Sequence, residues 1–133
     1  MANGPYASTS STSGGFLKAE IDWDDGDWVL IGCGEGYTYD IAHDVVDDLT
    51  DVLDTDTMVA AVVDGWADAD DNSLTVATGD TLRHLIIAEA GATATAKVIL
   101  HMDTNSNGTA INRPGNDSAF PVRWPTQGIF RIR

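Results

Sequence analysis

Apolar residues along the chain fall in short runs separated by segments rich in Gly, Asp and Asn. The run 28–33 (WVLIGC) is continuous and contains β-branched residues, which predicts a buried strand. Residues 74–78 and 93–102 alternate apolar and polar positions, which predicts half-buried strands. Further short runs predict strands at residues 16–23, 58–63, 82–90, 119–124 and 128–133. Residues 16–20 also fit a short helix.

One segment has helical periodicity. Its apolar positions recur at helical spacing: Ile41, Val45, Val46, Leu49 and Leu53. Aspartates fill the other faces, and Asp40 can cap the start. We therefore expect an amphipathic α-helix over residues 41–54. Aspartates near its C-terminal end oppose the helix dipole, so it should be short or frayed.

The 133 residues are enough for one core, and the order of elements predicts a mainly β fold. We expect a compact antiparallel β-sandwich or barrel of about six to seven short strands with one short inserted α-helix. Residues 16–133 form the single domain. Residues 1–15 are small, polar and uncharged, and form an extended arm without a core of its own. We expect this arm to lie on a neighbouring subunit, with Pro5, Tyr6 and Phe16 at the interface; folding back on its own domain is the alternative.

Acidic residues outnumber basic ones by 21 to 7, which gives a formal net charge of −14. This balance disfavours nucleic acid as a partner, because phosphate contacts need Lys and Arg. Eighteen of the acids are aspartates, which suits a surface adapted to high salt; a GC-rich genome also explains them. Basic residues gather near the C-terminus. We predict a subunit contact at Arg123, Arg131 and Arg133, with pairing to the chain's own aspartates as the alternative.

Several polar clusters are candidate sites. Asp103, Asn105 and Asn107 match the front half of a calcium loop, but Pro114 stands where the loop needs a bidentate Glu. A turn explains the same residues, so no metal or other cofactor is expected and calcium is the weaker alternative. The histidines lack a short metal-ligand spacing, although His84 and His101 lie on strands that can pair. With no nucleophile motif and a buried Cys33 expected, the chain is not predicted to be an enzyme.

The succession of segments resembles a group of short structural proteins of tailed viruses, encoded beside the major capsid protein. The chain opens with Met-Ala-Asn, and the resemblance then covers about residues 16–132. It is carried by these segments: FLKAEIDWD (16–24), IAHDVVDDL (41–49), DGWADADDNSLTVATGD (64–80), 84–88, 96–104, 120–124 and 128–132. The serine-rich arm at 7–15 and a shortened stretch near 55–63 depart from the pattern.

This resemblance implies a virion structural protein on the outer capsid surface. A capsid decoration protein that binds the major capsid protein as a homo-oligomer is the expectation, with no nucleic acid and no membrane as partners. A minor tail component, or a receptor- or glycan-binding module of the particle surface, is the alternative. Exposed aromatic rings at Trp66 and Trp124 would favour that alternative.

Overall fold

The chain is mainly β, with several antiparallel sheets. A computed structural model describes residues 4–5, 23, 26–63, 66–105, 107–125 and 129–131. The largest sheet has the order β1 (Gly4–Pro5), β9 (Val98–Met102), β8 (His84–Glu89), β2 (Trp28–Cys33) and β3 (Val52–Met58). Smaller sheets are formed by β12 (Phe130–Arg131), β5 (Trp66–Ala69) and β4 (Ala60–Val63), by β11 (Ala119–Val122) and β6 (Asn72–Thr75), and by β10 (Arg113–Pro114) and β7 (Thr81–Leu82).

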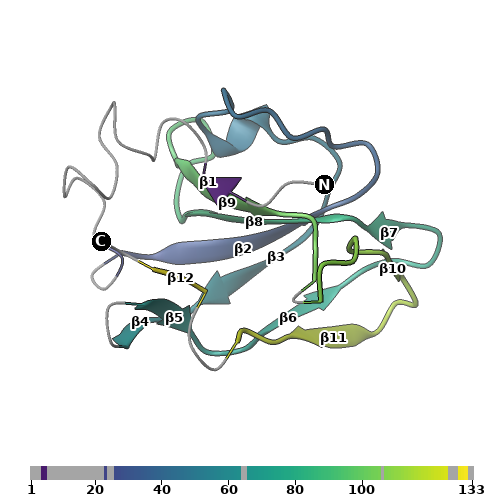
Figure 1. The fold of residues 1–133 in the computed structure, drawn as a ribbon. Helices are drawn as coiled ribbons and strands as arrows, with labels where there is room; N and C mark the ends of the chain where they lie inside the picture. Colours follow the sequence, from purple (N-terminus) through teal and green to yellow (C-terminus); the bar gives the residue numbers. More distant parts are fainter. Residues whose placement is uncertain are drawn as a thin grey trace.

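The large sheet is covered on both faces (Figure 1). One face packs against β5, β6 and β11, and the main core there includes Trp28, Leu30, Leu85, Ile87 and Phe120. The other face packs against the segment between β2 and β3, and its smaller core is formed by Ile31, Cys33, Tyr37, Leu49, Ile86, Ala88 and Val98. Successive residues of a strand point to opposite faces, so a strand buried on both sides must be apolar throughout.

Strand β2 therefore confirms the buried strand predicted at residues 28–33, with the same bounds. The described residues form twelve strands, more than the six to seven expected, and none of the sheets in this part of the chain closes into a barrel. The run 82–90 is divided at Arg83 into β7 and β8. The alternation at 93–102 becomes a strand only from Val98, because residues 93–95 form a turn.

The α-helix expected over residues 41–54 is wrong. The segment contains only the 3-10 helix η3 (Val46–Asp48), and β3 begins at Val52. The N–H groups of Val46 and Asp47 donate to the carbonyls of Ala96 and Thr93 instead of to carbonyls of their own segment. Pairing across the chain thus replaces the hydrogen bonds of an α-helix. No helix in the described residues is long and apolar enough to cross a membrane.

Two residues of the predicted arm are described. Gly4 and Pro5 form β1, which pairs antiparallel with Leu100 and His101 of β9 in the same chain. At these two positions the arm follows the alternative of folding back on its own domain. Tyr6 and Phe16 lie outside the described residues, as does most of the predicted strand at 16–23.

Aspartates join edge strand β3 to strand β6 of another sheet. Asp54 Oδ2 accepts the backbone N–H of Thr75 at 2.7 Å. Asp56 Oδ2 accepts the backbone N–H of Ser73 at 2.9 Å and the side-chain amide of Asn72 at 2.8 Å. Carboxylates here take the place of the carbonyls of a neighbouring strand, so part of the acidic composition has a structural role.

Asp56 provides a test by pH. The hydrogen bond from Ser73, followed by that from Asn72, holds the pKa of the Asp56 carboxyl below its ordinary value. Its stabilising effect is present above about pH 4 and is lost as the pH falls through the lowered pKa. We expect Asp56→Asn to lower the free energy of unfolding at pH 7 by about 1 kcal/mol. In denaturant melts, the difference from the wild-type chain should shrink below about pH 4. Asp47→Asn, at an exposed position on η3, is the control, and an equal pH-dependent loss there would contradict the assignment.

Candidate functional site

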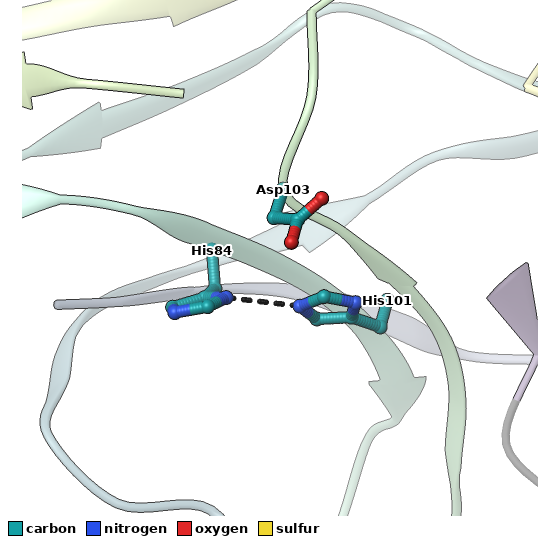
Figure 2. A group of neighbouring side chains, drawn as sticks. All are labelled: His84, His101 and Asp103. Carbon is teal, nitrogen blue, oxygen red and sulfur yellow. Dashed lines mark hydrogen bonds between the residues drawn. The ribbon is translucent and has the colours of Figure 1, made fainter. Parts of the chain in front are cut away.

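His84, His101 and Asp103 come together on one face of the β8–β9 pair. Ile86 lies opposite His101 in the register of β8 and β9. Side chains two residues apart on a strand point to the same face, so His84 lies on the face of Ile86 and Asp103 lies on the face of His101. All of these side chains therefore share one face of the pair. His84 Nδ1 and His101 Nε2 are 2.9 Å apart and hydrogen-bonded. Figure 2 shows the Asp103 carboxylate beside the gap between the two rings. One ligand atom from each of the three residues lies within 4.8 Å of the others.

Aromatic rings surround the two histidines. Tyr39 stacks on His101 with ring centroids 4.3 Å apart and planes inclined by 15°. Tyr37 meets His84 edge to face at 5.1 Å, and its hydroxyl group is hydrogen-bonded to His43 Nδ1 at 3.1 Å. Both tyrosines come from the segment between β2 and β3, so this irregular segment builds one wall of the cluster. The wall fixes the orientation of the imidazole rings.

The cluster favours neutral imidazole rings. Burial lowers the pKa of His84, and the Asp103 carboxylate and a backbone hydrogen bond with Tyr37 offset the effect only in part. His101 is fully buried. A hydrogen bond between two imidazole nitrogens also needs a lone pair on one of them, so the pair cannot be fully protonated and keep this contact. Neutral imidazole is the form that binds metals.

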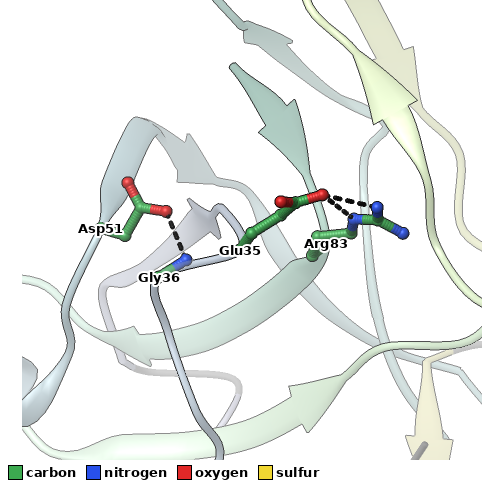
Figure 3. A network of polar contacts seen from close by, with 4 residues as sticks. All are labelled: Glu35, Gly36, Asp51 and Arg83. Carbon is green, nitrogen blue, oxygen red and sulfur yellow. Dashed lines mark hydrogen bonds and ion pairs between the residues drawn. The ribbon is translucent and has the colours of Figure 1, made fainter.

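A hollow of about 280 Å³ opens beside the cluster and is lined by Glu35, Arg83, His84, Asp103, Ala110 and Ile111. Arg83 closes an ion pair with Glu35 at 2.6 Å at this edge. Glu35 is placed by the turn that follows β2, where Asp51 accepts the N–H of Gly36 at 2.8 Å (Figure 3). A Cβ at Gly34 would collide with the Asp51 carboxylate and one at Gly36 would lie 3.0 Å from the Asp51 Cβ, so both glycines leave room for Asp51 at the turn that ends β2.

A second, larger hollow of about 730 Å³ lies among β9, β10, β11 and the segment after β11. Its floor is apolar and includes the buried side chains of Leu82, Leu85, Ile111 and Phe120. The two charged residues that line it are both arginines, Arg113 and Arg123, and both are exposed. The Arg113 guanidinium lies 4.5 Å from the centre of the Phe120 ring.

Of the predicted contact arginines, Arg123 is therefore at the rim of a hollow. Arg131 lies in β12, where its backbone pairs with Trp66, and Arg133 lies outside the described residues. Trp66 and Trp124, the two tryptophans expected to report on a glycan-binding surface, are both half-buried. Trp124 lines the same hollow, and its Nε1 donates to Asn72 Oδ1 at 3.0 Å.

The residues of the calcium candidate have separate contacts. Asp103 belongs to the histidine cluster. Asn105 Nδ2 donates to the Thr109 hydroxyl at 3.2 Å, and Asn107 Oδ1 accepts from the same hydroxyl at 2.7 Å. Gly108, at φ +81°, completes the turn. These contacts account for the Asn and Gly residues as turn formers; calcium binding there stays the weaker alternative.

Cys33 is fully buried, as expected. Burial, followed by the charge of Asp51, raises the pKa of its thiol to about 12. The thiolate is the reactive form of cysteine, so this position is chemically inert in the folded chain.

The sequence indicated that His84 and His101 can meet across strands, but its turn motif grouped Asp103 with Asn105 and Asn107. The signal that would have joined the three is the alternation His101-x-Asp103, which puts both side chains on one face of a strand. Comparison with protein-family models, with curated proteins and with solved structures found no match.

Proposed function

We propose that the chain is a non-catalytic structural protein that coats the outer surface of a tailed-virus shell as an oligomer and binds the major capsid protein. The resemblance of residues 16–132 to short virion proteins supports this role. The two covered faces of the large sheet support the description of the body as a β-sandwich, a stiff shape suited to bridging shell subunits.

The observation that carries the proposal is the hollow with Arg113 and Arg123 at its rim. The chain has a net charge of −14, yet no acidic residue among the described ones lines this hollow. Apolar floor and positive rim together fit an extended apolar segment flanked by acidic residues on the shell protein. The acidic surface outside this hollow faces away from the shell and repels other particles and nucleic acid.

Charge reversal at the rim tests the contact. We expect Arg123→Glu to lower occupancy on purified shells of the virus that encodes the chain by about tenfold or more, because a rim arginine facing an acidic partner becomes repulsive. Quantitative mass spectrometry of washed particles measures the occupancy. Lys97→Glu is the control, because it changes the net charge by the same amount. Lys97 forms an isolated β-bridge with Val45, and its charge reversal should leave occupancy unchanged. Melting temperatures of both variants establish that they fold. Equal occupancy of the Arg123→Glu and wild-type chains would contradict the docking face.

Copy number separates this role from the alternative. A decoration protein is present in hundreds of copies per particle, whereas a tail or receptor-binding component is present in a few. The half-buried Trp124 ring in the same hollow supports a glycan-binding module as the second candidate. Saccharide binding that disappears in Trp124→Ala, together with a low copy number, would favour that candidate over decoration.

A further inference from the structure

The pair of histidines and the nearby carboxylate have the composition of a transition-metal site. Imidazole nitrogen and carboxylate oxygen are the usual protein ligands of Zn²⁺, and three protein ligands with one open position are typical of sites that keep a water or an exchangeable ligand. His84, His101 and Asp103 offer such a set from two adjacent strands. We propose that these three residues bind a divalent transition metal ion of the zinc type, independently of any role on a virus shell.

The separation of the two imidazole nitrogens already approaches that of two ligands of a bound ion. The ligand atoms of a tetrahedral zinc site lie about 3.3 Å apart. His84 Nδ1 and His101 Nε2 are 2.9 Å apart, so a small rotation of either ring makes room for the ion. The hydrogen bond between the rings uses one N–H and one lone pair, whereas the metal needs the lone pairs of both nitrogens. Binding therefore moves one proton to the far nitrogen of its ring and replaces the hydrogen bond by two metal–nitrogen bonds.

The surroundings hold the ligands in place. Metal-binding histidines are normally oriented by second contacts, and here Tyr39 stacks on His101 while the edge of Tyr37 meets the ring of His84. The imidazole of His84 is also hydrogen-bonded to the backbone of Tyr37. Because the rings are fixed by packing, little conformational entropy remains to be lost when the ion binds.

The hollow of about 280 Å³ supplies the entry path and the fourth position. His84 and Asp103 both line it, whereas the fully buried His101 forms the inner end of the site. Glu35 at the same edge is held by Arg83, so this pair lies next to the open position without supplying one of the three ligands. The fourth ligand is then water or a small anion that reaches the ion through the hollow.

The test uses the full chain freed of metal with a chelator and titrated with ZnCl₂ in a calorimeter. We expect one Zn²⁺ to bind per chain and to raise the melting temperature. His84→Gln and Asp103→Asn should each lower the affinity by at least about 100-fold, because loss of a ligand costs no less than loss of a contact that only orients a ligand. Asp80→Asn, at an exposed position outside the cluster, is the matched control for Asp103→Asn, and its affinity should stay within a few-fold of wild type.

Two further measurements keep the proposal open to refutation if a variant folds poorly. Co²⁺ bound by the wild-type chain should give the visible absorption of a tetrahedral nitrogen–oxygen site, and Zn²⁺ should abolish it. The ring nitrogens of His84 and His101, but not those of His43, should shift in NMR spectra on addition of Zn²⁺. Zn²⁺ binding that is equally tight in the wild-type chain and the two ligand variants, or ring shifts at His43 alone, would overturn the proposal.

Discussion

Replacement of Trp28 by alanine should lower the free energy of unfolding by about 3–5 kcal/mol. Trp28 is buried in the main core and stacks on Trp23 with ring centroids 5.1 Å apart. Its Nε1 donates to the Trp23 carbonyl at 2.8 Å, and Trp23 Nε1 in turn donates to the carbonyls of Ala61 and Asp68. The alanine variant therefore loses packing volume and also the contact that orders the second tryptophan.

Denaturant unfolding followed by tryptophan fluorescence measures this effect. Trp28→Phe retains most of the ring and loses only the Nε1 hydrogen bond, so its cost should be about 1–2 kcal/mol. The difference between the two variants isolates the contribution of packing. A cost below about 1 kcal/mol for Trp28→Ala would mean that this stacked pair does not anchor the core.

Gly115→Ala should destabilise the fold by about 3 kcal/mol or more, the upper part of the range for overpacking. A Cβ at this position would collide with the Ala77 carbonyl oxygen and lie 2.5 Å from that of Val76. These atoms belong to backbone that is held in place, since the Gly115 N–H donates to the Asp80 carbonyl at 2.8 Å and the Asp117 N–H donates to that of Val76 at 3.1 Å. Neither side of the contact can move without losing a hydrogen bond.

Gly108→Asn is the matched control for this glycine. Gly108 has φ +81°, and a Cβ added there would meet nothing within 4 Å, so its requirement is for backbone conformation alone. Asn adopts left-handed backbone at modest cost, and we expect a loss below about 1 kcal/mol. Thermal melts of the two variants compare the effects. Equal losses would contradict a steric origin at Gly115.

The sequence pattern predicted the β class because the strands of the large sheet are covered on both faces. A continuous apolar run such as 28–33 has few other interpretations, and β2 has those bounds. The helix at 41–54 was predicted from spacing that the segment does have, but the N–H groups of Val46 and Asp47 donate to the carbonyls of Ala96 and Thr93. Such long-range pairing leaves no local trace, because it depends on where the turn after β8 places its carbonyls.

The candidate metal site was predictable only in part, for a related reason. The alternation of His101 and Asp103 on one strand is visible in the sequence, but the register that brings His84 beside them is set by the pairing of β8 with β9. Asp103 also belongs to an Asp/Asn/Gly motif with a familiar alternative meaning. The structure shows that Asn105 and Asn107 contact Thr109 and form a turn. Only these contacts reveal that Asp103 has a role separate from that turn.

The buried thiol of Cys33 can report how often the fold around it opens. It is the single cysteine, it is fully buried, and its raised pKa suppresses the thiolate that alkylating reagents attack. Because it lies at the end of β2, between β8 and edge strand β3 and under the segment that joins β2 to β3, reagent reaches it only when that segment or the sheet opens. The rate of alkylation in native buffer therefore measures how often this part of the fold opens, without denaturant.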